Sequence, residues 1–355
     1  MTLLNSLLHL TNFRNPFLRT LVPSVATAFA IQGAVAVPSI LAQSERFYDL
    51  SGSLTYLSVT ALSLYLPTLR ARAASTIKPP FPSLLAAFTG TGGPHGLNWR
   101  QVVLSTAVSI VRIKSHLYLP KSGTGSNFAL GRDSPGSFSL RKPRLTSRKW
   151  ATRLGTYLFQ RILSDGHDSR FDEIKKSPPK FFGAWMAQAT WVSLCLLPVL
   201  AVNSIPHTLL STLPLVTLTD VLGLGLFVGG LTFEVIADRQ KSAWVRAKKA
   251  KQHDEDFLTS GLWSKSRHPN YFGESTLWTG LAVTSFGILR ARGAGVSVNG
   301  LSAFALCAVS PVFVTFLLLK VSGVPLSEKK YDERYGDRKE YREWKESTPM
   351  FIPKL

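Results

Sequence analysis

The chain has 355 residues, of which 45% are hydrophobic and only 17% are charged, a low share of charge for a soluble protein of this size. Its net charge of +20 would suit a nucleic-acid-binding protein, but the basic residues cluster in loops between long apolar segments and no nucleic-acid-binding motif is present. We therefore expect no nucleic acid as a partner. We predict an all-α, multi-pass transmembrane helical bundle in a lipid bilayer.

Residues 1–119 form the first predicted domain, made of N-terminal membrane helices. Its first 44 residues lack Asp and Glu, which fits either a mitochondrial presequence or the lead into a first membrane helix. At about 20 apolar residues per crossing, three segments are span candidates, and a shorter stretch is interfacial or re-entrant. The three segments are 17–43, 50–69 and 102–119, and the shorter stretch is 81–88. We expect Arg112, Lys114 and His116, towards the end of the third segment, to lie at the interface and snorkel.

Residues 120–148 are predicted to be a flexible basic insertion. The segment is rich in Gly and Ser, and Asp133 is its only acidic residue. A second basic loop, 239–251, holds six basic residues and no acidic one. Because basic loops stay on the cytosolic side of a membrane, both are predicted to be cytosolic.

Residues 149–355 form the second predicted membrane domain, which ends in a charged cytosolic tail. With its four segments the total is about seven spans; they are 182–202, 213–236, 275–289 and 301–320. The run at 223–230, GLGLFVGG, favours close contact between helices and lacks the spacing of a dinucleotide fingerprint. Cys195 and Cys307 lie in apolar segments without metal-ligand spacing, so no metal site is predicted.

The most polar stretch beside the membrane is 261–274, GLWSKSRHPNYFGE. Pro269 suits the first turn of a helix, so a helix is predicted to start at 268–270. Helix N-termini present free backbone N–H groups, and here Lys265, Arg267 and His268 stand just before them. This combination predicts a binding site for phosphate.

A second polar group ends the 213–236 segment. Glu234, Asp238 and Lys241 are spaced to share one face of a helix, and Glu234 is still inside the apolar zone. A carboxylate within a membrane segment is functional or critical for packing. For Asp238 and Lys241 the alternative is a simple ion pair at the surface.

The motif at 267–274, RHPNYFGE, resembles the C-terminal domain of steroid 5-alpha-reductases, and more closely a related membrane family of unknown function. The resemblance continues through most of 149–355, in segments that keep their order. These are 153–166, 171–172, 188–191, 233–241, 262–274 and 335–353.

The resemblance implies a membrane enzyme that holds NADPH in a cytosol-open cavity and reduces an enone-like double bond. Carried over by position, it assigns cofactor contacts to two sets of residues. The first is Arg267, His268, Asn270, Tyr271 and Glu274 with Lys265, and the second is Asp238 and Lys241 with Tyr335 and Tyr341. It supplies no counterpart for the Glu and Tyr pair that polarises the substrate carbonyl. The candidates for this role are Asp49, Tyr56 and Glu234.

Three functions fit these features. The first is an NADPH-dependent reductase acting on a sterol-like or enoyl-lipid substrate. The second is a membrane methyltransferase of the isoprenylcysteine type, which shares an Arg-His-Pro motif and would use S-adenosylmethionine. The third is a non-catalytic lipid-binding or scaffold protein. The basic residues before Pro269 favour a polyphosphate cofactor and hence the reductase. We expect the protein in the endoplasmic reticulum, with a mitochondrial membrane as the alternative.

Overall fold

The computed structural model describes residues 3–89, 96–118, 171–291 and 299–354, and the regular elements in these ranges are helices, which confirms the all-α class. The predicted insertion at 120–148 lies outside these ranges. The first half contains α1 (Leu3–Leu10), α2 (Pro16–Leu41), α3 (Tyr48–Ala74), α4 (Ala86–Thr89) and α5 (Trp99–Tyr118). The second half contains α7 (Pro178–Asn203), α8 (His207–Leu210), α9 (Leu218–Lys249), η2 (Gly261–Ser264), α10 (Pro269–Arg290), α11 (Gly300–Phe316), η3 (Leu317–Val321), α12 (Val324–Tyr335) and α13 (Lys339–Ser347).

Four helices in the described ranges are long and apolar enough to cross a membrane, so the chain is an integral membrane protein. They are α2, α7, α9 and the continuous run Gly300–Tyr335 that joins α11, η3 and α12. The predicted count of about seven is not confirmed. α3 and α10 have 27 and 22 residues but carry many Ser, Thr and Gly residues, which lowers their hydropathy.

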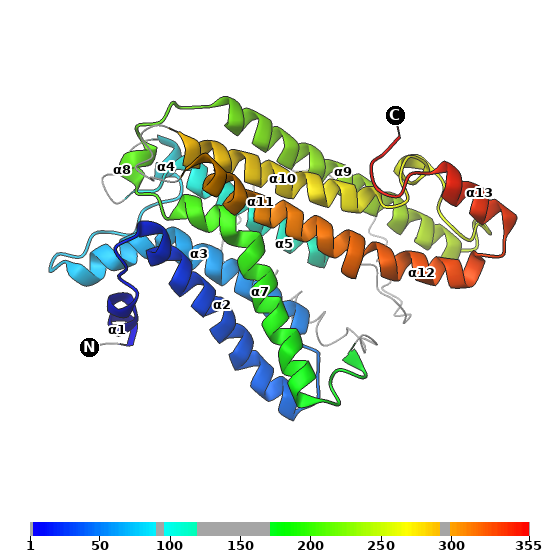
Figure 1. Cartoon of the computed structure of the whole chain (residues 1–355), viewed down its shortest axis with the longest axis horizontal. Helices are drawn as coiled ribbons and strands as arrows, with labels where there is room; N and C mark the ends of the chain where they lie inside the picture. The colour runs from blue at the N-terminus through cyan, green and yellow to red at the C-terminus, as the bar shows by residue number, and fades with distance from the viewer. Residues whose placement is uncertain (1–2, 90–95, 119–170, 292–298, 355) are drawn as a thin grey trace, which may run out of the picture.

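The long helices form two groups (Figure 1). α9, α10 and α11 run along one side of the molecule, and α2 and α3 lie on the other. α7 joins the groups, because it contacts α2 and α3 as well as α10 and α11. One buried cluster of apolar side chains therefore draws on both halves of the chain.

Glycines bring α9 and α10 into close contact, as the sequence predicted. A Cβ atom at Gly223 would lie 2.7 Å from Gly280 O, and one at Gly230 would lie 2.7 Å from Gly273 O. Larger side chains at these positions would force the helices apart. Two further glycines of the same run, Gly225 and Gly229, have nothing within 4 Å of an added Cβ. α9 and α10 therefore pack closely along their length.

α9 differs from the predicted span 213–236 at both ends. It starts at Leu218, because Thr217 and Asp220 form a capping box that fixes the first turn. It then runs 32 residues to Lys249, roughly 48 Å at 1.5 Å per residue. Since a bilayer core is about 30 Å thick, one end of α9 projects beyond it.

Arg112 does not snorkel outward, so the prediction was wrong for this residue, while the side chains of Lys114 and His116 lie outside the described part of the chain. Its guanidinium lies over the rings of Tyr56 and Trp191, 5.4 and 4.7 Å from the ring centres. Aromatic faces attract a cation, so they stabilise this charge inside the bundle. The segment 81–88 forms no span: α4 is a single turn, and Phe81 and Phe88 are exposed.

Candidate functional site

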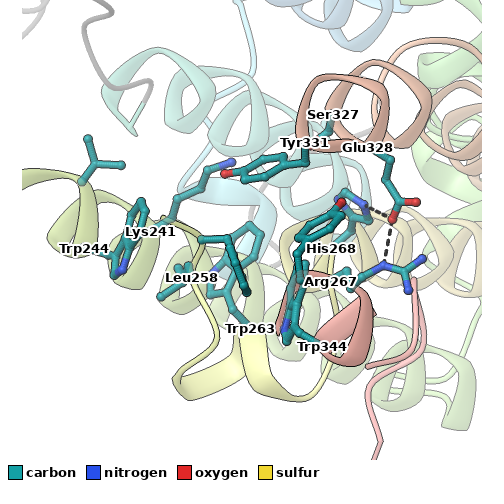
Figure 2. A pocket seen from close by; sticks show the side chains of 13 residues that line it. Lys241, Trp244, Leu258, Trp263, Arg267, His268, Ser327, Glu328, Tyr331 and Trp344 are labelled. Carbon is teal, nitrogen blue, oxygen red and sulfur yellow. Dashed lines mark hydrogen bonds and ion pairs between the residues drawn. The ribbon is translucent and has the colours of Figure 1, made fainter. Parts of the chain in front are cut away.

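A pocket lies among the projecting end of α9, the start of α10, and α12 and α13 (Figure 2). Its empty space is about 560 Å³, a volume that includes the part open to solvent. Its aromatic wall consists of Trp244, Phe257, Trp263, Tyr331, Tyr341 and Trp344. Its polar side chains are Lys241, Arg267, His268, Ser327 and Glu328, and Val245 and Leu258 complete it.

The turn η2 fixes Trp263 on the inner wall. Gly261 has a φ of +61°, in the region that favours glycine, and an added Cβ would strike the side chain of Gln240 on α9. Gln240 Oε1 accepts a hydrogen bond of 2.9 Å from Leu262 N. Trp263 Nε1 donates a bond of 3.0 Å to Ala237 O. These bonds hold the indole ring against α9.

Arg267 ties the start of α10 to the C-terminal tail. Its Nε donates to Glu328 Oε1 at 2.8 Å. Its Nη1 donates to the carbonyl oxygens of Lys345 and Thr348, and its backbone N–H donates to Pro349 O at 2.9 Å. The side chain is only 13% exposed, so several of its donors are already used within the protein.

His268 shares the carboxylate that Arg267 binds. Its Nε2 lies 3.2 Å from Glu328 Oε1, and its ring stacks on Tyr271 with centres 5.3 Å apart and planes 6° apart. The next residue, Pro269, opens α10, as predicted from the sequence. The N-terminus of α10 is therefore bordered by the Arg267 guanidinium, the His268 imidazole and the Glu328 carboxylate.

The tail closes the pocket through a network around Asp332 on α12. Tyr341 Oη donates to Asp332 Oδ1 at 2.8 Å, and Lys345 Nζ lies 2.6 Å from the same oxygen. Burial and the bond to Asp332 raise the pKa of Tyr341, so its phenol stays neutral and keeps donating at physiological pH. Ser266 Oγ also donates to Phe351 O at 2.9 Å. The tail is thus held at both of its ends.

Four of the predicted cofactor-binding residues line this pocket: Lys241, Arg267, His268 and Tyr341. They come from α9, the start of α10 and α13, which are far apart in the sequence. Asp238 lies one turn before Lys241 and interacts with it electrostatically.

The other predicted cofactor-binding residues lie beside the pocket. Tyr271 is the stacking partner of His268, and Tyr335 packs its ring 6.0 Å from Phe257. Asn270 is in the first turn of α10, and its buried Oδ1 has no hydrogen-bond partner in the described ranges. Lys265 is exposed.

Glu274 lies on α10 and is half-buried. It lies close enough to Tyr56 and Cys195 for electrostatic interaction with both. It also interacts in this way with Tyr271, which stacks at the pocket edge. Glu274 therefore interacts electrostatically with a residue at the pocket edge and with the buried phenol of Tyr56.

The three candidates for the catalytic acid have different environments. Asp49 is exposed in the first turn of α3. Glu234 is buried where α9 meets α10, since a Cβ added at Gly273 would lie 2.7 Å from its backbone nitrogen. Tyr56 is 1% exposed in the core, and its hydroxyl makes no hydrogen bond to a nitrogen or oxygen of the described residues.

Sequence reasoning missed part of the aromatic wall, namely Trp244, Phe257 and Tyr331. Trp244 stands three residues after Lys241 and so shares its side of α9, a signal that the interpretation of 239–251 as a basic loop concealed. Tyr331 stands three residues after Glu328 on α12 in the same way. Phe257 is in a loop, where no periodic pattern marks it.

A family model described as a protein of unknown function, DUF1295, matches residues 145–348, which is more than half of the chain. The chain belongs to this family. The match includes each of the thirteen residues that line the pocket. Searches of curated proteins and of solved structures gave no match.

Proposed function

We propose that this DUF1295 protein is a membrane reductase that binds NADPH and reduces a carbon–carbon double bond of a lipophilic, sterol-like or enoyl-lipid substrate. One observation carries the proposal: the pocket has an aromatic wall and cationic side chains at the projecting end of a membrane helix. Its residues Lys241, Arg267, His268 and Tyr341 are among those that the resemblance to steroid 5-alpha-reductases assigns to the cofactor.

The side chains present suit a dinucleotide. Aromatic faces stack with heterocyclic bases, each stack contributing about 1–3 kcal/mol. Lys241 offers a positive charge for phosphate. Trp344 Nε1 is buried without a hydrogen-bond partner in the described ranges, which leaves a donor for a ligand oxygen. Bound NADPH would supply the hydride.

Tyr56 is the best candidate for the acid that polarises the substrate carbonyl. Its phenol is buried in the bundle, and Arg112 lies 5.4 Å from the centre of its ring. Trp191 packs against the ring edge at 5.3 Å, which fixes its orientation. A donor held in a dry environment stabilises charge that develops on a substrate oxygen more strongly than water does.

The same set indicates how a lipophilic substrate would lie. Arg112 and Glu274 bring opposite charges near Tyr56, so the electrostatic potential around its hydroxyl is neither strongly positive nor strongly negative. A neutral carbonyl would fit there, with the apolar part of the substrate among the membrane helices. We place this function in the endoplasmic reticulum, and a mitochondrial membrane is the alternative.

Titration of the full-length protein in detergent with NADPH and with S-adenosylmethionine tests the cofactor. We expect NADPH to bind, and Tyr331→Leu to weaken it about fivefold or more through loss of a stacking face. The matched control is Tyr65→Leu on α3, outside the pocket, which should leave the affinity unchanged.

Other results would redirect the proposal. Binding of S-adenosylmethionine alone would assign the protein to the methyltransferases. Binding of neither ligand would contradict both enzyme functions and leave a lipid-binding or scaffold protein.

The role of Tyr56 is tested by Tyr56→Phe, which removes one oxygen and keeps the ring. We expect reduction of an enone lipid to slow by about 10²–10⁴-fold, the range for positioned acid catalysis. NADPH affinity and thermal stability should not change, because the phenol lies outside the pocket. Unchanged turnover would remove Tyr56 from the mechanism.

A further inference from the structure

A second pocket lies at the end of the bundle opposite the candidate site. It is formed by the C-terminal half of α3, the start of α5 and the link between α7 and α8. Figure 1 shows α4 and α8 at this end of the molecule and α12 and α13 at the other. Its residue Gln101 follows Arg100, which binds Asp220 in the first turn of α9. Lys241 of the candidate site stands near the far end of that helix, so roughly 30 Å of α9 separates the levels of the two pockets.

The polar lining of the second pocket is neutral in character. Its polar side chains are Thr68, Gln101 and His207, and its described lining contains no Asp, Glu, Lys or Arg. Gln101 Nε2 donates to Val202 O at 3.3 Å and to Ile205 O at 3.1 Å, and its Oε1 accepts a bond of 3.1 Å from Asn98 N. Because both amide hydrogens are used, Gln101 can offer a ligand only an acceptor.

Pro67 frees a further acceptor beside this pocket. Proline has no N–H group, so the carbonyl oxygen of Ser63, four residues earlier in α3, lacks its usual helix donor. Leu64, the next residue after Ser63, lines the pocket together with Pro67. Thr68 follows Pro67, is only 2% exposed, and adds a hydroxyl that can donate or accept. Such a lining suits a ligand that donates a hydrogen bond and carries no charge.

Exposed apolar side chains beside the pocket indicate the source of its ligand. Leu64 and Leu97, which line the pocket, pack in one cluster with Ala87 of α4. On either side of Ala87, Leu85 and Phe88 are 79% and 58% exposed. Large apolar side chains exposed together are typical of a surface that contacts a membrane. We therefore expect α4 to lie in the bilayer interface, so that the pocket is within reach of lipids.

We propose that the second pocket binds the hydroxyl end of a neutral membrane lipid, such as a sterol or a diacylglycerol, while the apolar part of the lipid lies against α4. The hydroxyl donates to Gln101 Oε1 or to the Ser63 carbonyl and accepts from Thr68. A phospholipid does not fit, because the described lining offers no Lys or Arg for its phosphate. The proposal does not depend on the reductase function, since the two pockets share no lining residue.

Photolabelling of the full-length protein in phosphatidylcholine nanodiscs tests this site. Two probes carry a diazirine and a free hydroxyl: an analogue of cholesterol and a diacylglycerol. Each probe competes with its unlabelled parent lipid and with the methyl ether of that parent, which cannot donate a hydrogen bond. Mass spectrometry maps the labelled peptides. We expect label on the peptides that contain Thr68, Gln101 or Pro206, displaced by the parent lipid and not by its methyl ether.

The variant Thr68→Val removes the hydroxyl and keeps the shape of the side chain. It should raise the probe concentration that gives half-maximal labelling about fivefold, the effect of one lost hydrogen bond. The matched control is Thr60→Val, because Thr60 is a buried threonine of the same helix that does not line the pocket. We expect the control to change this concentration less than about twofold.

The outcomes are distinct. Label from the cholesterol analogue alone identifies a sterol, label from the other probe alone identifies a diacylglycerol, and label from both identifies a site for the shared hydroxyl; each supports the proposal. Absence of label from these peptides with both probes, or equal competition by the methyl ethers, overturns it. So does an unchanged half-maximal concentration in Thr68→Val, or an equal change in Thr60→Val. NADPH binding is measured separately, so these results leave the reductase proposal untouched.

Discussion

The two ends of α9 use an arginine and a carboxylate in different ways. Near its start, Arg100 binds Asp220 with Nη2 2.7 Å from Oδ2, and both side chains are 1% exposed. Arg100 Nη2 also donates to Pro214 O at 2.7 Å. Near the other end, Arg267 and Glu328 form a pair that is 13% and 20% exposed and borders the pocket.

The difference separates a structural pair from a binding surface. At the Arg100 end the charges are sealed, and Asp220 also caps α9, so this pair fixes the position of α5 against α9. At the Arg267 end the pair leaves space beside it and a cation, Lys241, without a carboxylate partner in the described ranges. Available space beside the charged side chains, more than residue type, distinguishes the site.

Asp220→Ala should give the largest loss of stability. Arg100 would remain buried without its counter-ion, which costs about 3–5 kcal/mol in comparable pairs. Thermal unfolding in detergent would show a large drop in melting temperature or a failure to accumulate folded protein.

Glu328→Ala is the matched change at the other end. Arg267 would keep its bonds to the tail carbonyls and gain access to water, so we expect a loss below about 2 kcal/mol. Equal destabilisation by the two variants would contradict the distinction between the two ends.

Arg267→Ala should have an intermediate effect, of about 1.5–3 kcal/mol for lost charge-assisted bonds. The tail would separate from the start of α10, and the wall formed by Tyr341 and Trp344 would move. Limited proteolysis should therefore cut the tail faster, and NADPH affinity should fall as well. Lys265→Ala, an exposed neighbour, is the control for the proteolysis measurement. A protected tail in Arg267→Ala would show that other contacts hold it.

Short sequence patterns predicted the features of the fold that depend on neighbouring residues, such as helix starts and helix bounds. The start of α10 at Pro269 followed from the fixed φ of proline, and the close α9–α10 contact followed from the glycine run. The approximate bounds of α2 and α7 followed from hydropathy. The shared location of Lys241, Arg267, His268 and Tyr341 came from the family resemblance rather than from periodicity.

Contacts between distant segments could not be predicted in this way. Arg267 and Glu328 are 61 residues apart, and no local pattern shows that the tail folds back on α10. Arg112 was misplaced because its aromatic partners Tyr56 and Trp191 lie on other helices. The span count was affected by α3 and α10, whose polar small residues pack inside the bundle and lower their hydropathy.

The smallest effect that we predict is a loosening of the tail at low pH through Asp256. Hydrogen bonds from Lys248 and Arg338 hold the pKa of Asp256 below its usual value of 3.8. A carboxyl group whose pKa is lower in the folded than in the unfolded state stabilises the folded state at pH values above its unfolded-state pKa. This stabilisation is lost as the pH falls through the folded-state pKa. From neutral pH down to about 4 the joint should therefore hold, and below that it should weaken.

The test compares hydrogen exchange of the tail in wild type and in Asp256→Asn between neutral pH and pH values below about 4. The difference between the two proteins isolates the contribution of the Asp256 charge from that of other acidic groups. The variant should exchange faster than wild type at neutral pH, because it lacks the charge that binds Lys248 and Arg338. The two proteins should converge below pH 4, as the pH falls through the lowered pKa of Asp256 and the wild-type carboxyl becomes neutral. A constant difference between them at every pH would show that the shape of the Asp256 side chain, and not its charge, holds the joint.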